Sequence, residues 1–353
     1  MGTAGIRRLN IGAARREEDQ LAQADPGAQS ADTAAAGSIE LLTAGFSGER
    51  LDRFLARSLP QYSRTRLQRW IELGAVTWDE RVLGRRHRLS GVETLLVDPQ
   101  PLEADSAFEP EPVDFPVVFE DDAILVIDKP AGLVVHPAAG NWHGTLLNGL
   151  LHRYQSQTAL PRAGIVHRLD KDTSGLMVVA RTERSMAALS EQLSDRSMGR
   201  RYLALVLGSP GDRGVVEAPI GRDPVQRVRM AVVSGSAGRQ ARTSFRTLAE
   251  GRLGVRRVTL IECRLHTGRT HQIRVHMRHI GTPIIGDELY GGLAHDACPR
   301  QALHAWRLTL VHPVSGRSRA WVSGWPAQLA ALLGETGIDP EEAMTLAGSP
   351  WSD

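Results

Sequence analysis

The chain has 353 residues, of which 42% are hydrophobic, and its 42 Lys and Arg residues nearly balance its 40 Asp and Glu residues. This length allows two or three domains. The sequence has no apolar run long enough to cross a membrane, no signal-peptide core, no phosphate-binding loop and no dinucleotide-binding glycine motif, which argues against membrane anchoring, nucleotide hydrolysis and dinucleotide redox chemistry. Because Cys263 and Cys298 cannot build a disulfide framework, we expect a cytoplasmic protein. Because the sequence contains no cofactor-binding motif, we also expect the protein to need no cofactor.

The near balance of charge hides five segments of different composition. Basic and acidic residues number 4 and 6 in residues 1–47, 10 and 7 in 48–100, 0 and 5 in 101–114, 28 and 17 in 115–330, and 0 and 5 in 331–353. A long segment with a net charge of +11 favours binding of a polyanion, of which nucleic acid is the commonest. Codon bias explains why these cations are nearly all Arg, but it does not explain why acidic residues are scarce in the same segment.

The N-terminal third is predicted to be a tail followed by a small domain. Residues 1–47 are rich in Ala, Gly, Gln and Asp and are expected to be disordered. Residues 48–100 contain two helical patterns, the first ending at Pro60 and the second capped by Ser63, and then short alternating strands. The polar side of the second helix carries three arginines: Arg64, Arg66 and Arg69.

The rest of the chain is predicted to be a linker, a large domain and a second tail. Residues 101–114 contain three prolines and five acidic residues, which is typical of a linker. Residues 115–330 mix strands and helices without βαβ regularity, so the predicted class is α+β with a mostly antiparallel sheet. Residues 331–353 are interpreted as an acidic C-terminal tail.

The densest polar stretch of the large domain, residues 164–175, is predicted to be a loop before a buried strand. Within it, Asp170 is flanked by Arg168 and Lys171. Neighbouring cations favour an ionised carboxylate, which is a nucleophile that needs no general base. A loop stabilised by ordinary ion pairs explains the same residues, and from the residues alone it is the stronger interpretation.

The second polar cluster, residues 266–278, includes several histidines and arginines and opens a helix that we expect Thr270 to cap. A metal site is disfavoured because His271 and His276 are five residues apart and cannot share a helix face. Arg274 and Arg278 do share a face, which could bind an anion or simply be solvated. Tyr202, after Arg200 and Arg201, is either a core aromatic or a platform for a base.

Several of these motifs resemble, in order, those of the RluA family of pseudouridine synthases. The family's central motif is matched by residues 167–175, its second by 201–204 and its third by 267–277, with further likeness at 283–291 and 303–305. Residues 49–97 resemble an S4-type RNA-binding module. The combination is most similar to the RluD-type members, which act on uridines in a stem-loop of 23S ribosomal RNA.

The resemblance implies a role for four residues. Asp170 would be the nucleophile, Tyr202 would stack on the target uracil and assist proton removal from its C5, Arg274 would pair with Asp170, and Arg168 would enter the space left by the flipped base. Other cations expected to contact RNA are Lys171, Arg269, His271 and Arg278, together with Arg64, Arg66 and Arg69. The implied partner is 23S rRNA or the assembling large ribosomal subunit, bound by a monomer without a metal or cofactor.

Two alternatives remain open from the sequence. A non-catalytic RNA-binding factor for ribosome assembly would use the same basic surface, although it would have no need for Asp170, Tyr202 and Arg274. A metal-dependent hydrolase would use the histidines of residues 266–279. The sequence also leaves open whether the carboxylate would attack C1′ of the ribose or C6 of the uracil.

Overall fold

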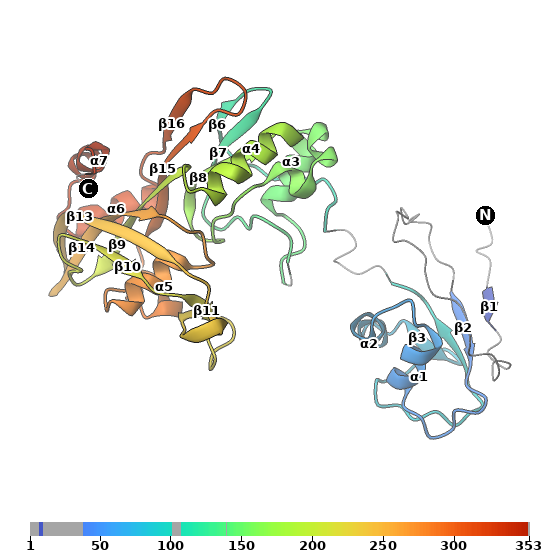
Figure 1. The fold of residues 1–353 in the computed structure, drawn as a ribbon. Coiled ribbons are helices and arrows are strands. Elements are labelled where there is room, and N and C mark those ends of the chain that lie inside the picture. Colours follow the sequence, from blue (N-terminus) through green and yellow to red (C-terminus); the bar gives the residue numbers. More distant parts are fainter. Residues whose placement is uncertain (1–6, 10–37, 101–106, 139, 352–353) are drawn as a thin grey trace. The chain divides into compact units, whose positions relative to one another are not determined.

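The computed structural model describes residues 7–9, 38–100, 107–138 and 140–351, and the chain divides into two compact units, 1–105 and 106–353 (Figure 1). Among the described residues, no helix is both long enough and apolar enough to span a lipid bilayer.

The small unit packs two helices on a five-stranded sheet. Its core is formed by the apolar faces of both helices, where Phe54 and Trp70 are fully buried, and Ser63 caps the second helix by accepting a hydrogen bond from the Arg66 amide. The strand order is β1-β2-β5-β3-β4. The elements are β1 (Arg7–Leu9), β2 (Ile39–Leu42), α1 (Leu51–Ser58), α2 (Arg64–Glu72), β3 (Val76–Trp78), β4 (Arg81–Val82) and β5 (Thr94–Val97).

The strand β2 corrects the prediction that residues 1–47 form a disordered tail. It pairs with β5 in antiparallel register, and Leu41 is fully buried in the core of the small unit. The apolar residues of β2 form only a short pattern within a segment rich in Ala and Gly. The composition of that segment therefore predicts disorder although β2 is a strand. Residues 1–6 and 10–37 of the expected tail lie outside the described residues.

The large unit is built on a nine-stranded sheet with the order β10-β13-β14-β9-β15-β8-β7-β6, in which β16 also pairs with β15. Every pairing except β15 with β8 is antiparallel, which confirms the predicted α+β class. Its strands are β6 (Val117–Glu120), β7 (Ile124–Lys129), β8 (Ser174–Ala180), β9 (Gly199–Leu207), β10 (Arg213–Glu217), β13 (Arg242–Leu253), β14 (Arg256–Leu265), β15 (Leu303–Val311) and β16 (Ser318–Val322), and a separate hairpin is formed by β11 (Ile220–Arg222) and β12 (Met230–Val232).

The central strand β8 is covered on both faces. Its side chains alternate between two clusters: Met177 and Val179 join the main core, whereas Leu176 and Val178 pack with Leu189 of helix α4. Such a strand has a continuous apolar run, as the sequence predicted. The helices of this unit are α3 (Leu146–Arg153), α4 (Glu183–Ser194), α5 (Gln272–His279), α6 (Ala327–Glu335) and α7 (Pro340–Gly348).

The prediction of an acidic C-terminal tail is wrong for the described part of residues 331–353. Helix α6 buries Leu332 and Leu333 in the main core, and the Arg246 guanidinium donates to the Ala347 carbonyl at the end of α7. The acidic residues Glu341 and Glu342 lie in the first turn of α7. They signal a helix N-terminus, where negative charge is favourable, rather than a solvated tail.

The second half of the predicted linker 101–114 is also part of the large unit. Asn148 of α3 donates to the carbonyls of Ala107 and Glu109 at 3.1 and 2.8 Å, and the Gly144 amide donates to the Glu111 carboxylate at 2.7 Å. A side chain at Gly149 would lie only 2.8 Å from Val113, so glycine allows this close approach. Glu111 of this segment therefore binds a backbone amide. The acidic composition of the segment does not reveal this contact.

Candidate active site

Asp170 lies in the loop that leads into β8, between two buried anchors. Leu169 belongs to the main core, and Thr173 is buried and donates its amide to the Asp170 carbonyl at 3.1 Å. Gly175 follows at φ +118°, where an added Cβ would lie 2.3 Å from the Ala305 carbonyl oxygen of the paired strand β15. The loop is thus fixed at both ends, while the Asp170 side chain stays 17% exposed.

A buried arginine connects Asp170 to a second carboxylate. Arg274 of α5 donates from Nη1 to Asp170 Oδ2 at 3.2 Å. It also donates from Nε and Nη2 to the two carboxylate oxygens of Asp287 at 2.7 and 2.8 Å. Burial opposes the charge of Arg274, but the bonds and charges of Asp287 and Asp170 raise its pKa above the ordinary value. Arg274 is therefore a fixed cation held against Asp170.

Two further basic side chains hold the backbone of the Asp170 loop. The Lys129 Nζ donates to the carbonyls of Pro130, Leu133 and Lys171, and burial lowers the pKa of this fully buried amine to about 7. Buried Arg300 donates to the Asp172 carbonyl at 3.0 Å. These contacts satisfy loop carbonyls that would otherwise be buried without partners, so they hold Asp170 in place.

The Asp170 carboxylate faces a cleft of about 490 Å³ whose charged lining is almost entirely cationic. Two of its histidines add no charge at neutral pH, because burial and nearby arginines lower the pKa of His136 to about 4 and that of His167 to about 3. Among the described residues that line the cleft, Asp170 is the only carboxylate, and the arginines there are Arg162, Arg168, Arg200, Arg269 and Arg274. Such a cleft suits a polyanion that presents one group to Asp170.

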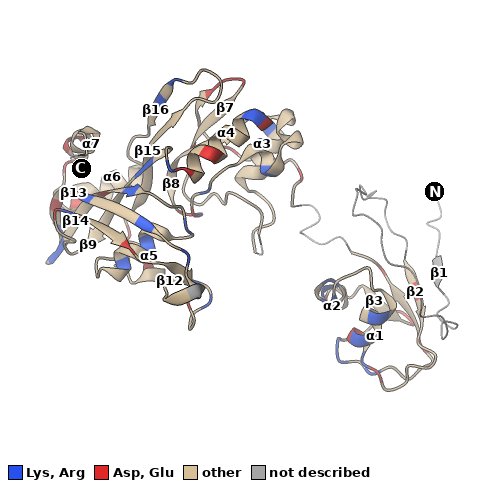
Figure 2. Ribbon diagram, viewed as in Figure 1, with Lys and Arg blue, Asp and Glu red and all other residues tan. Residues whose placement is uncertain are grey.

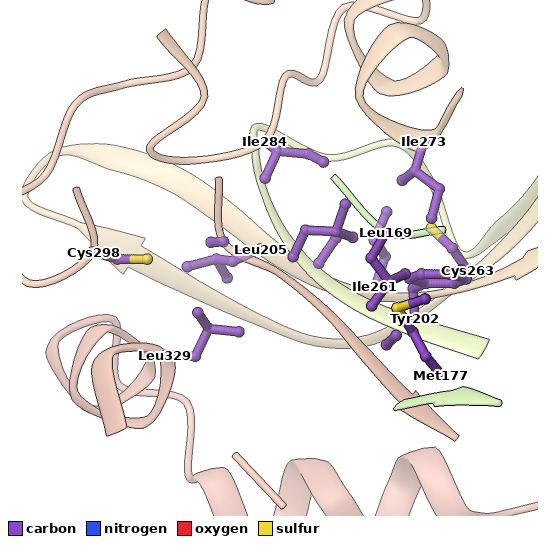
Figure 3. Packing of buried hydrophobic residues seen from close by; sticks show 14 of the residues in the cluster. Leu169, Met177, Tyr202, Leu205, Ile261, Cys263, Ile273, Ile284, Cys298 and Leu329 are labelled. Atoms are coloured by element: carbon purple, nitrogen blue, oxygen red, sulfur yellow. The ribbon is translucent and has the colours of Figure 1, made fainter. Parts of the chain in front are cut away.

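Tyr202 forms part of the cleft wall but is only 5% exposed. In Figure 3 it lies among Leu169, Met177 and Cys263, which belong to the same buried cluster. Burial raises the pKa of its phenol, so the hydroxyl stays protonated at neutral pH. This favours the apolar interpretation of Tyr202, as a surface for a base, over a role as an ionised base.

The other predicted RNA-contacting residues of the large unit fall into two groups. Arg168, Arg269 and His271 line the cleft with Asp170. Lys171 and Arg278 do not: the Lys171 side chain is exposed, and Arg278 donates to the Tyr290 carbonyl at 2.8 Å beside the β11–β12 hairpin.

The three predicted arginines of the small unit lie on α2, and Figure 2 shows basic residues on both helices of that unit. Arg64 and Arg69 are exposed, and Arg69 lies 4.0 Å from the Glu72 carboxylate. Arg66 is half-buried and lies over the rings of Tyr62 and Trp70 at 5.3 and 5.4 Å. Helix α2 therefore presents an exposed basic face.

The histidines near α5 are separated by their contacts. His276 is buried between Thr243 and the Ala218 carbonyl, whereas His266 binds Ser244 and His271 binds the Tyr290 hydroxyl. Within the described ranges, no group of three or more His, Cys, Asp or Glu side chains is placed to hold a metal ion. The predicted Thr270 cap is wrong, because the N-cap is His271, in the left-handed conformation at φ +57°.

Three supporting residues were missed by reasoning from the sequence. Asp287 stands in a short Gly-Asp pair without helical or strand periodicity, and Arg300 follows a proline in a loop. Lys129 did carry a signal: it is one of only two lysines in a chain whose other basic residues are arginine. The compact ammonium group of Lys129 donates to three carbonyls, a geometry that a planar guanidinium does not match.

Comparison with known proteins identifies the class of this fold. Residues 123–279 match the family model described as RNA pseudouridylate synthase, and residues 49–86 match the S4 domain model. Among solved structures, human RNA pseudouridylate synthase domain containing 1 is similar with a TM-score of 0.53 at 23% identity, covering 69% of this chain and 98% of that one, which shows a shared fold.

Curated relatives are similar over most of the chain. The ribosomal large subunit pseudouridine synthase D of Nitrosomonas europaea is 49% identical over 317 residues, covering 86% of this chain and 90% of the relative. That of Pseudomonas aeruginosa is 47% identical, covering 81% and 91%. The chain belongs to the RNA pseudouridylate synthase family, and it is an isomerase that converts uridine to pseudouridine in RNA.

Proposed function

We propose that this enzyme isomerises specific uridines of 23S rRNA, with Asp170 as the nucleophile. The single observation that supports the catalytic part is the Asp170–Arg274 pair, in which the only carboxylate among the described residues of the cleft lining lies beside a fixed cation. The names of the similar relatives support large-subunit ribosomal RNA as the substrate. Purified full-length enzyme is expected to form pseudouridine in 23S rRNA and not in 16S rRNA. Equal formation in both would contradict this substrate.

The reaction exchanges one bond to the ribose for another. Uracil leaves C1′ as its N1–C1′ bond breaks, the ring turns, C5 bonds to C1′, and the C5 proton is lost while N1 gains one. The Asp170 carboxylate can stabilise or bond to C1′ while uracil is detached, as carboxylates do in glycoside chemistry. Attack on C6 of the ring is the alternative path. In either path the guanidinium of Arg274 donates to the Asp170 carboxylate and compensates its negative charge in the cleft.

The target uridine must leave its stack to reach Asp170, which costs a few kcal/mol. The arginines of the cleft offset this cost by binding phosphates, and the exposed Arg168 is placed to enter the space left by the base. Tyr202 then provides a buried wall on which uracil stacks.

The remaining parts of the proposal concern partners. The small unit, through Arg64, Arg66 and Arg69, binds phosphates near the target loop, and Arg269 and His271 of the cleft together with Lys171 and Arg278 extend the contact. We place the enzyme in the cytoplasm as a monomer acting on free rRNA or on an assembling large subunit. Measuring pseudouridine formation on free rRNA and on assembling large subunits, at equal concentration, shows which of the two is the preferred substrate.

A further inference from the structure

A chain of three hydrogen-bonding groups connects the β11–β12 hairpin to Asp170. The Met230 amide donates to the Tyr290 hydroxyl oxygen at 2.9 Å, and this hydroxyl lies 2.8 Å from His271 Nδ1. The other ring nitrogen of His271, Nε2, lies 3.9 Å from Asp170 Oδ1. Asp170 is thus approached by Arg274 at one oxygen and by His271 at the other.

Burial fixes the direction of the bond between Tyr290 and His271. Tyr290 is 1% exposed, so its hydroxyl hydrogen needs an acceptor within the protein. The Met230 amide already donates to this oxygen, and His271 Nδ1 is the acceptor within reach among the described residues. The hydroxyl therefore donates to Nδ1, which leaves the hydrogen of a neutral imidazole on Nε2.

Two further observations concern His271. Its backbone is left-handed at φ +57°, and its side chain lines the cleft. Burial and Arg274 lower the pKa of its imidazole in spite of the opposing charge of Asp170, so the ring is neutral at pH 7.

We propose that Tyr290 is a positioning residue of the active site, whose hydroxyl holds His271 as an Nε2–H donor directed at Asp170. This inference rests on the proposed role of Asp170. The Nε2–H closes on the carboxylate, directly or through one water, when substrate excludes solvent from the cleft. The Nε2–H of His271 then orients Asp170 Oδ1, the oxygen to which Arg274 does not donate. The same carboxylate oxygen therefore always faces the ribose.

The substitution Tyr290→Phe removes the hydroxyl and keeps the ring, over which the Arg274 guanidinium lies at 4.9 Å. We expect kcat to fall about tenfold with KM for RNA nearly unchanged, because one positioning hydrogen bond is lost. The matched control is Tyr154→Phe, which removes a hydroxyl that binds Glu120 outside the cleft, and it should leave kcat unchanged.

The direct readout is the tautomer of His271, measured by nitrogen-15 NMR on the full chain without RNA. His271→Asn identifies the signal, because Asn accepts the left-handed backbone. We expect the Nε2–H tautomer in the wild type and in Tyr154→Phe, and a mixture in Tyr290→Phe. An Nδ1–H tautomer in the wild type would overturn the proposal, and so would an unchanged tautomer and kcat in Tyr290→Phe. Because this readout needs no turnover, it stays valid if Asp170 proves not to be the nucleophile.

Discussion

The two units of this enzyme use arginine in opposite ways. In the large unit, Arg274 and Arg300 are buried and bonded to carboxylates or carbonyls around the Asp170 loop. In the small unit, Arg64 and Arg69 are exposed on one helix. Fixed, desolvated charges position reacting groups, whereas exposed charges add affinity that depends on salt. The comparison predicts that substitutions of the buried arginines around the Asp170 loop change kcat and stability, and that substitutions of the exposed arginines of helix α2 change KM and salt dependence.

The largest effect is expected for Asp170→Asn. The amide has nearly the same shape as the carboxylate but is no nucleophile, so turnover should fall at least about a thousandfold. RNA affinity should stay within a few fold, because the arginines of the cleft are unchanged. Single-turnover pseudouridine formation and RNA binding, measured on the same preparation, check both parts. A turnover above a few per cent of the wild type would remove Asp170 from its role.

The next effect is expected for Arg274→Ala, which leaves buried Asp287 without its partner. Removing one member of a buried ion pair costs about 3–5 kcal/mol, so this variant should lose both activity and stability. Denaturant unfolding measures the stability loss, and Arg256→Ala, at an exposed arginine of β14, serves as the control with little change. Full activity of Arg274→Ala at neutral pH would contradict the pairing.

A smaller effect, confined to binding, is expected when Arg64, Arg66 and Arg69 are all replaced by Ala. The loss of three phosphate contacts should make the slope of log affinity against log salt shallower by about two units and raise KM, with kcat little changed. Deleting residues 1–100 should give the same trend and poorer site choice on rRNA.

The control for this variant removes three exposed arginines of the large unit and so makes the same change in net charge. It carries Ala at Arg256, Arg317 and Arg319. If it shifts the salt slope as much as the helix α2 variant does, net charge rather than the small unit is responsible. Equal slopes for wild type and the α2 variant would show that this helix takes no part in recognition.

The smallest expected effect is a pH dependence of stability that arises from Lys129. Its pKa is about 7 in the folded protein because of burial, below the ordinary value of 10.5, so between these values the unfolded chain binds more protons than the folded one. Stability relative to Lys129→Met should therefore rise as pH increases from 7 to 10. Unfolding both proteins across this range isolates the effect, and a constant difference would contradict the lowered pKa.

The sequence predicted those elements that repeat a pattern over many residues or depend on adjacent ones. The apolar run of β8 and the helix α2 with its Ser63 cap were predicted correctly, because each depends on neighbouring residues. The acidic helix α7 was not predicted, because it is held in place by contacts such as that of the distant Arg246, which donates to the Ala347 carbonyl. Composition identifies acidity but cannot tell a helix N-terminus from a solvated tail.

The candidate site shows the same division. The motifs around Asp170 and Arg274 lie in two short stretches, so their resemblance to a family was enough to locate both residues from the sequence alone. Asp287, Lys129 and Arg300 act through atoms that only the fold brings near the loop. Asp287 binds the charge of Arg274, whereas Lys129 and Arg300 donate to backbone carbonyls. The spacing of residues in the sequence does not predict such contacts.

The measurement that tests the central claim most directly is a map of pseudouridines in total RNA from cells with and without this gene, complemented by wild type or by Asp170→Asn at equal protein levels. The account predicts that specific 23S rRNA pseudouridines disappear without the gene, return with the wild type and stay absent with Asp170→Asn. Their return with Asp170→Asn, or an unchanged 23S rRNA map without the gene, would contradict it.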